Sequence, residues 1–260
     1  MNFLQELLTG MLGQAPTTLL LLAVAGAFVT GGVVKGLLGV GLPLITVPLL
    51  ALVIPSPKAI ALMVMPIVLS NLWQSATGGH TRTAMRRFAS LLVPMVILTA
   101  ITARLTLDLP VRTLNMLVGG AVLIATAMIA WQPALHVAPR VERRWGAFVG
   151  VLTGILGGIS SLMGPFLISY LVALRLPREV FVGSISLIYL AGALPLYTVM
   201  ALSGVLGWAE IAASTLALAP MSLGMLAGTR MRQHVSEALF RKLMLVFLVC
   251  VAAALFLRSA

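Results

Sequence analysis

The sequence predicts an all-α, polytopic membrane protein with two inverted repeats, each holding a Gly/Pro-interrupted, re-entrant helix pair and three transmembrane helices. Three observations favour this fold class. Of the 260 residues, 60% are hydrophobic and only 9% are charged, whereas soluble proteins carry about 25% charged residues. The apolar residues form long uninterrupted segments. A similar glycine-rich pattern occurs once in each half of the chain.

Eight apolar segments are expected to form the helices. None of them alternates apolar and polar residues as a barrel strand does, so the spans are expected to be helical. The segments cover residues 17–54, 59–77, 88–107, 113–131, 146–174, 180–203, 211–229 and 238–257. A transmembrane helix needs about 20 residues, and two of the segments, 17–54 and 146–174, are much longer. Each of these two is therefore expected to form two shorter helices around a break.

The two long segments resemble one another. The stretch "GAFVTGGVVKGLLGVGLPLI" (26–45) aligns with "GAFVGVLTGILGGISSLMGPFLI" (146–168) across a small gap. The alignment pairs Gly32 with Gly154, Gly36 with Gly158, and Pro43 with Pro165. Three further apolar segments follow each stretch, so we expect an internal duplication. Its parts are a first repeat at 1–131, a cytoplasmic linker at 132–145 and a second repeat at 146–260.

Basic residues in the short loops predict which ends of the helices face the cytoplasm. Loops 78–87, 132–145 and 230–242 carry most of the arginine and lysine, so all three are expected inside. The segment 146–174 must then enter and leave on the same side, as a hairpin. If the first long segment does the same, both termini lie outside and the repeats are inverted. Lys58 is an exception, because this lone positive charge falls in a linker that is expected outside.

The two breaks are expected to line a substrate site. Glycine leaves backbone N–H groups uncovered, and proline suits the first turn of a helix. Each break therefore starts a helix with bare amide donors, which favour anions. Inverted repeats with interrupted helices are typical of secondary transporters, whose site lies near the membrane midplane. The alternative is that the glycines only permit close helix packing, since Gly32/Gly36 and Gly154/Gly158 have small-xxx-small spacing.

Lys35 is a cation inside an apolar segment, directly before the first break. A charge at bilayer depth costs about 3 kcal/mol on insertion scales and by default marks a functional site. One interpretation is that Lys35 attracts an anion. The other is that it snorkels to the interface or caps carbonyl groups at the end of the first helix. The second break has no matching lysine, so any site is asymmetric.

Few polar residues lie within the expected spans, and each could bind an oxyanion or only a neighbouring helix. They include Ser70, Asn71, Gln74, Ser160, Ser161, Tyr170, Ser184, Ser186, Tyr189 and Tyr197. Asn71 and Ser184 rank first, because each follows a break on the next helix. The residues predicted to line the substrate site are Lys35, Gly36, Gly39, Gly41, Pro43, Asn71, Gly158, Ser161, Gly164, Pro165 and Ser184.

The remaining charged residues argue against several functions. The six acidic residues and three histidines fall in expected loops or segment ends, so we expect no buried carboxylate and no metal site. The sequence contains no H-E-x-x-H motif and no other catalytic constellation, so we expect neither enzyme activity nor a cofactor. The net charge of +11 comes from short loops without interleaved aromatic residues. This pattern favours anionic membrane lipid over nucleic acid as a partner.

The stretch "GGVVKGLLGVGLPLITVPLL" (31–50), with a diverged echo at 150–174, resembles the sulfite exporter TauE/SafE family and its KGxxGxGxP pattern. By position, Lys35, Gly36, Gly39, Gly41, Pro43 and Pro48 match the first copy of the pattern, and Gly154, Gly158, Gly164 and Pro165 match the second. The resemblance implies permeation of small anions such as sulfite, sulfonates or organic acids. We therefore expect a transporter that exports a small anion across a bacterial-type inner membrane by alternating access. An anion channel and a non-transporting scaffold remain alternatives, and a homodimer is left open.

Overall fold

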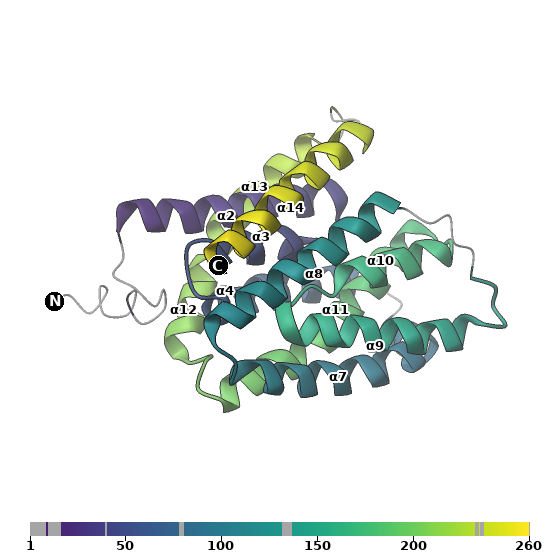
Figure 1. Ribbon diagram of the computed structural model, residues 1–260. Helices are drawn as coiled ribbons and strands as arrows, with labels where there is room; N and C mark the ends of the chain where they lie inside the picture. The colour runs from purple at the N-terminus through teal and green to yellow at the C-terminus, as the bar shows by residue number, and fades with distance from the viewer. Residues whose placement is uncertain are drawn as a thin grey trace.

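The computed structural model describes residues 9, 17–39, 41–77, 81–131, 137–231, 234 and 237–259, and the elements in these ranges are all helices (Figure 1). The helices of the first half are α2 (Thr18–Leu38), α3 (Leu42–Ala51), α4 (Ser56–Ala61), α5 (Val64–Thr77), α6 (Thr81–Arg87), α7 (Ala89–Leu107) and α8 (Val111–Trp131). Those of the second half are α9 (Glu142–Ser160), α10 (Gly164–Ala173), α11 (Arg178–Leu202), α12 (Trp208–Leu216), α13 (Leu218–Met231) and α14 (Glu237–Ser259).

The structure confirms that both long apolar segments are interrupted. Helix α2 ends at Gly39, with φ +79°, and α3 starts after Gly41, with φ +93°. Residues other than glycine adopt such left-handed backbone angles only at a cost of about 1–2 kcal/mol. Helix α9 ends at Ser161, which takes up this conformation with φ +60° despite its side chain, and α10 starts three residues later. Proline follows the start of both second helices, as expected for a first turn.

In each pair, the short second helix folds back along the first. At the end of α10, the Ala173 carbonyl accepts a hydrogen bond of 3.3 Å from the Val137 amide, just upstream of α9. The Tyr170 hydroxyl donates to the carbonyl of Glu142, the first residue of α9, at 3.0 Å. In the first pair, a Cβ on Gly31 of α2 would overlap the side chain of Thr46 of α3. Both pairs are therefore helical hairpins.

Helix α2 packs against α13, and glycines on both helices make the contact close (Figure 1). A Cβ on Gly32 or Gly36 would overlap carbonyl oxygens of α13. A Cβ on Gly224 or Gly228 would overlap carbonyl oxygens of α2 in the same way. Gly224 lies against residue 29 and Gly228 against residue 33, so the residue numbers rise together and the two helices run parallel.

Helix α9 packs closely against α7 through glycines in the same way (Figure 1). The glycines of α9 lie against the backbone of α7, pairing Gly150 with Leu91, Gly154 with Met95 and Gly158 with Thr99. These two helices also run parallel. The first helix of each half therefore pairs with the third long helix of the other half, so the two packing contacts are reciprocal.

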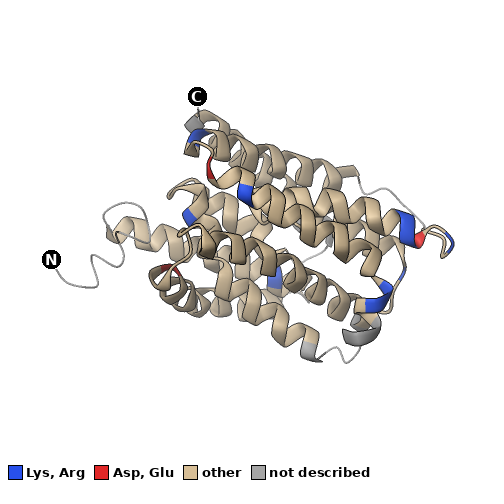
Figure 2. Cartoon of the chain, turned by 90° about the horizontal axis from the view of Figure 1, so that it is seen from below, with Lys and Arg blue, Asp and Glu red and all other residues tan. Residues whose placement is uncertain are grey.

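Charged residues gather mainly at two ends of the bundle (Figure 2). At one end, here called the Arg87 end, the Arg87 guanidinium donates to the Glu142 carboxylate, with an Nε–Oε1 distance of 2.7 Å. At the opposite end, called the Lys58 end, Lys58 forms an ion pair with Glu210 of α12. Helix α7 runs from the first end to the second, where Arg104 pairs with Asp108 as the i, i+4 spacing predicts.

Glu210 corrects an expectation, because the sequence predicts no buried carboxylate and this residue is only 6% exposed. Its carboxylate accepts from the Gly207 amide at 2.9 Å as well as from Lys58. A buried carboxylate is stable when it is paired and hydrogen-bonded in this way. The pairing also neutralises the charge of Lys58, which is the positive residue that fits the orientation rule least well.

The outer surface is strongly apolar. Large exposed hydrophobic side chains occur on most of the long helices, among them Leu22, Trp73, Leu105, Trp131 and Leu194. Such a surface is unusual for a soluble monomer and suits contact with lipid. Six spans in the described ranges are long and apolar enough to cross a membrane, at Thr18–Leu38, Ser56–Ser75, Ala89–Leu107, Val111–Trp131, Val180–Leu202 and Trp208–Met231. The chain is therefore a multi-pass membrane protein.

The short helices of the hairpins lie inside this bundle. Nine of the ten residues of α3 are buried, and its Ile45, Val47 and Leu50 are among the least exposed side chains. Backbone that leaves the helical conformation cannot face lipid, because its polar groups would have no partner there. The burial of the hairpins by neighbouring helices explains how the chain tolerates two breaks at membrane depth.

Candidate functional site

Lys35 lies in the last turn of α2, and only 4% of its surface is exposed. It lines a small pocket, called here the Lys35 pocket. The lining residues are Lys35, Gly41, Leu42, Pro43, Ile67, Asn71 and Tyr189. They come from the first break and from two helices, α5 and α11. The interpretation of Lys35 as a snorkelling residue is therefore disfavoured, because the side chain is enclosed by protein.

The ammonium group of Lys35 is held by two neutral partners on α5. It donates to the Ser70 hydroxyl at 2.9 Å and to the Asn71 side-chain oxygen at 3.4 Å. The Ser70 hydroxyl in turn donates to the Pro66 carbonyl, and the Asn71 amide donates to the Ile67 carbonyl at 2.9 Å. These bonds leave the Ser70 and Asn71 oxygens oriented to accept. A lysine has three N–H donors, so the two bonds leave one donor for a ligand.

The positive charge of Lys35 is not neutralised by protein in the described ranges. The ion pairs found there join Lys58 with Glu210, Arg87 with Glu142, and Arg104 with Asp108. A buried charge is expensive unless it is paired. A negatively charged group beside Lys35 would therefore lower the cost of burying its charge.

The start of α3 adds to this positive potential. Gly41, Leu42 and Pro43 line the pocket at the first turn of the helix. The first amide groups of a helix have no carbonyl one turn earlier to bind, and the helix dipole places a partial positive charge at this end. Lys35 and the start of α3 thus act on the same small volume.

Tyr189 of α11 connects the pocket to the second break. Its side chain lines the Lys35 pocket, and a Cβ on Gly164, at the start of α10, would lie 2.7 Å from its hydroxyl. The hydroxyl is buried and has no hydrogen-bond partner among the described residues. The two breaks therefore approach one another at Tyr189, and the structure brings Lys35, Gly41, Pro43 and Asn71 together there, with Gly164 beside them.

Gln74 joins the first break to α5 and α11. Its side-chain amide donates to the Gly39 carbonyl at 3.3 Å, and its side-chain oxygen accepts from the Ser186 hydroxyl at 3.1 Å. Gln74 is one turn beyond Asn71 on α5, and Ser186 is one turn before Tyr189 on α11. These bonds hold the loop of the first break against the two helices that supply the rest of the pocket.

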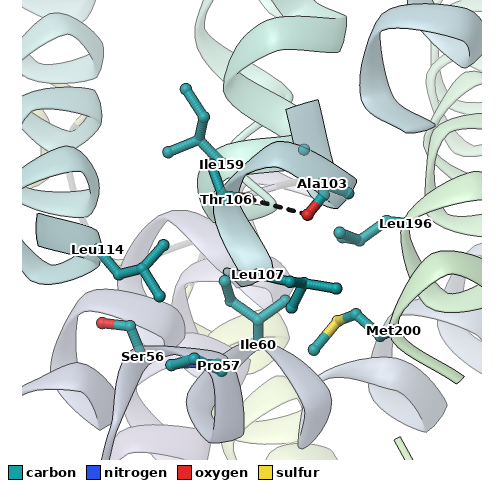
Figure 3. Close-up of a pocket in the computed structure, with 11 residues that line it drawn as sticks. Ser56, Pro57, Ile60, Ala103, Thr106, Leu107, Leu114, Ile159, Leu196 and Met200 are labelled. Carbon is teal, nitrogen blue, oxygen red and sulfur yellow. Dashed lines mark hydrogen bonds between the residues drawn. The ribbon is translucent and has the colours of Figure 1, made fainter. Parts of the chain in front are cut away.

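A second pocket lies beside the second break, toward the Lys58 end (Figure 3). It is lined by Ser56, Pro57, Ile60, Ala103, Thr106, Leu107, Leu114, Gly158, Ile159, Leu196 and Met200. Figure 3 shows Ile60, Leu107 and Met200 close together in it, and the Thr106 hydroxyl bonded to the Ala103 carbonyl. Among the described residues, those that line this Gly158 pocket are mostly apolar, and Ser56 and Thr106 are the polar ones.

Other predicted site residues lie apart from the Lys35 pocket lining. Gly36 and Gly158 lie at the α2–α13 and α9–α7 contacts, and close helix packing explains their small size. Ser161 caps α9 beside the Tyr197 hydroxyl. Ser184 is buried on α11, five residues before Tyr189 and so on a different face of the helix. The substrate role predicted for these four residues stays a prediction.

The ranking of polar residues from the sequence chose Asn71 but passed over Ser70, Gln74, Ser186 and Tyr189. The spacing of these polar residues in the sequence could have identified them. Ser70 and Gln74 are four residues apart, and Ser186 and Tyr189 are three apart, so each pair shares one face of its helix. A polar face on the long helix that follows each break, α5 in the first half and α11 in the second, would have indicated these residues better than proximity along the chain.

Comparison with known proteins gives one match. The model of the family described as sulfite exporter TauE/SafE matches residues 22–255. No curated protein and no solved structure matches the chain. The match covers both hairpins and all the residues that line the Lys35 pocket.

Proposed function

Because the chain belongs to the sulfite exporter TauE/SafE family of membrane transporters, we propose that it carries a small oxyanion bound in the Lys35 pocket. Sulfite, an organosulfonate or a related organic acid is the substrate class. The observation that carries this proposal is the enclosed ammonium of Lys35, which has neutral hydrogen-bond partners and faces the start of α3. An anion in the pocket would supply the missing negative charge.

The helix packing supports a transport mechanism based on two inverted repeats. Helix α7 runs from the Arg87 end to the Lys58 end, whereas its counterpart α13 follows Glu210 of α12 at the Lys58 end and runs away from it. Because α9 runs parallel to α7 and α2 runs parallel to α13, equivalent helices of the two halves run in opposite directions. The Lys35 pocket lies near the end of α2 that is distant from the Lys58 end, and the Gly158 pocket lies toward the Lys58 end. Rocking of one repeat against the other would open the site alternately to these two sides.

The charge distribution supports an orientation with the Arg87 end in the cytoplasm. Arg86, Arg140, Arg143, Arg144, Arg175 and Arg230 lie at helix ends or loops on that side. On the opposite side, Lys58 and Arg104 are each paired with an acid. The positive-inside rule then places both termini outside. An inside-negative potential drives an anion outward by about 2.3 kcal/mol per charge per 100 mV, which favours export.

A flux assay tests the proposed function. Purified protein in liposomes is loaded with unlabelled sulfite, methanesulfonate or acetate, and the entry of labelled anion is measured. We expect saturable uptake that is accelerated by anion on the opposite side. Uptake without such counterflow would indicate an anion channel. Absence of anion-dependent uptake for every substrate in the panel would contradict the proposal and favour a scaffold role.

Site-directed labelling tests the orientation. Cys250 is the single cysteine of the chain, so Ala138→Cys and Ser203→Cys are each made in a Cys250→Ala background. Both positions are exposed and lie at opposite ends of the bundle. We expect an impermeant maleimide added outside to label position 203 and not position 138. Labelling of both positions from the same side would contradict the proposed arrangement.

A further inference from the structure

We propose that the Tyr189 hydroxyl is a second hydrogen-bond donor to the transported anion, in addition to Lys35, and that it tunes affinity for oxygen-bearing anions. This inference rests on the proposed function of the Lys35 pocket. Three observations carry it. Tyr189 lines the pocket together with Lys35, its hydroxyl has no hydrogen-bond partner in the part of the chain that the structure describes, and the residue is only 5% exposed.

The missing partner is the first argument. A buried hydroxyl without a hydrogen bond is unfavourable, because it loses its bonds to water without replacement, so buried tyrosines usually reach an acceptor. The residues around Tyr189 in the pocket offer the Lys35 ammonium, which donates, and the Asn71 oxygen, which already accepts from Lys35. A phenol hydroxyl can donate to an oxyanion oxygen, and hydrogen bonds to charged acceptors are the strong ones. An oxyanion is therefore the ligand that satisfies both Lys35 and Tyr189.

Gly164 supplies the second argument. It is the first residue of α10, and a Cβ there would lie 2.7 Å from the Tyr189 hydroxyl. Only glycine leaves the hydroxyl its place between the second break and the pocket. The second break, which has no basic residue in the last turn of α9 before it, thus contributes to the site through the position it allows Tyr189 to take.

Tyr197 supplies the contrast that makes the inference testable. It is a second buried tyrosine on α11, eight residues further on, but its hydroxyl donates to the Ile60 carbonyl at 3.4 Å. The two residues share a helix, a side chain and a degree of burial, and they differ in whether the hydroxyl has a partner. Tyr189→Phe and Tyr197→Phe therefore form a matched pair.

The experiment measures the concentration dependence of sulfite transport in liposomes and the melting temperature in detergent for wild type, Tyr189→Phe, Tyr197→Phe and Lys35→Met. For Tyr189→Phe we expect the KM for sulfite to rise about tenfold or more, the value of one lost hydrogen bond to a charge. The melting temperature without anion should stay equal or rise, because an unsatisfied buried group is removed. Tyr197→Phe should leave KM unchanged. Gly164→Ala should raise KM in wild type and add little in Tyr189→Phe.

The outcomes separate this inference from the proposed function. If Lys35→Met abolishes transport while Tyr189→Phe keeps the wild-type KM, the role of Tyr189 is wrong and the Lys35 pocket stands. If Tyr189→Phe and Tyr197→Phe lower the melting temperature and change KM equally, Tyr189 is only structural and the inference is wrong. If sulfite, methanesulfonate and acetate are not transported by wild type, both proposals fall.

Discussion

At the first break, α2 ends on Gly39 with Lys35 one turn earlier, whereas at the second break α9 ends on Ser161 and has no basic residue in its last turn. The backbone is similar in the two places. A long helix ends in a left-handed residue, a short helix with proline in its first turn folds back, and glycines seat the long helix on a parallel neighbour. The chemistry differs, because only the first break presents an ammonium group to a pocket.

This difference indicates that both hairpins need close packing, whereas a buried cation is present at only one of the two breaks. Each hairpin must be seated closely among its neighbours, since irregular backbone at membrane depth has to be covered by protein. A charge at that depth is costly. If Lys35 binds the anion as proposed, one cation between the two breaks suffices, and a second would add desolvation cost and repulsion. The asymmetry of the site is therefore compatible with a symmetric scaffold.

Removal of the Lys35 charge at the first break should reduce anion transport far more than a substitution at the second break. Lys35→Met should lower anion transport about 30-fold or more, since loss of one partner from a buried, hydrogen-bonded charge pair costs about 2–5 kcal/mol. Ser161→Ala, at the second break, should keep most of the activity. The measurement is initial uptake of labelled sulfite into liposomes. Lys242→Met, at an exposed lysine of α14, serves as the control for loss of a positive charge. An equal loss of sulfite uptake in the Lys35 and Ser161 variants would contradict the proposed difference between the two breaks.

Substitution of the glycines at the α2–α13 and α9–α7 contacts tests whether the two contacts stabilise the protein to a similar extent. Gly36→Ala and Gly158→Ala should each destabilise the protein by about 1–3 kcal/mol, because the added Cβ overlaps backbone of α13 or α7 and overpacking costs this much. The midpoint of denaturation in mixed micelles gives the measurement.

The controls for this pair are Gly26→Ala in α2 and Gly120→Ala in α8, where a Cβ would meet nothing within 4 Å. These should be neutral or slightly stabilising, since alanine favours the helix. Loss of transport by Gly36→Ala without loss of stability would instead support a direct role of this glycine toward the substrate.

Substitutions at the two left-handed residues, Gly41 and Ser161, should change the stability of the protein slightly and in opposite directions. Gly41→Ala should destabilise by about 1–2 kcal/mol, because alanine at φ +93° clashes with its own backbone. Ser161→Gly should stabilise by about 0.5–1 kcal/mol, because glycine relieves the same clash at φ +60°. Melting temperatures in detergent measure both. A destabilising Ser161→Gly would show that the serine side chain contributes more beside Tyr197 than its backbone strain costs.

The membrane class, the helical spans and the two interruptions could all be predicted from the amino-acid sequence. These features depend on local properties. Apolar length decides what can cross a bilayer, and glycine followed by proline decides where a helix stops and the next one starts. The same local reasoning marked Lys35 as a charge out of place, and Asn71 lies within hydrogen-bonding distance of it in the structure.

Which polar residues contact one another could not be predicted from the sequence, because it depends on how the helices pack. Tyr189 and Gln74 reach the first break from other helices, and no spacing along the chain specifies those contacts. The structure also buried Glu210 by pairing it with Lys58, which the position of the acid at a segment end could not indicate. The physical reason is that burial and pairing are properties of packed helices, set by glycine contacts between segments far apart in sequence. A pattern read along one segment carries no information about its partner.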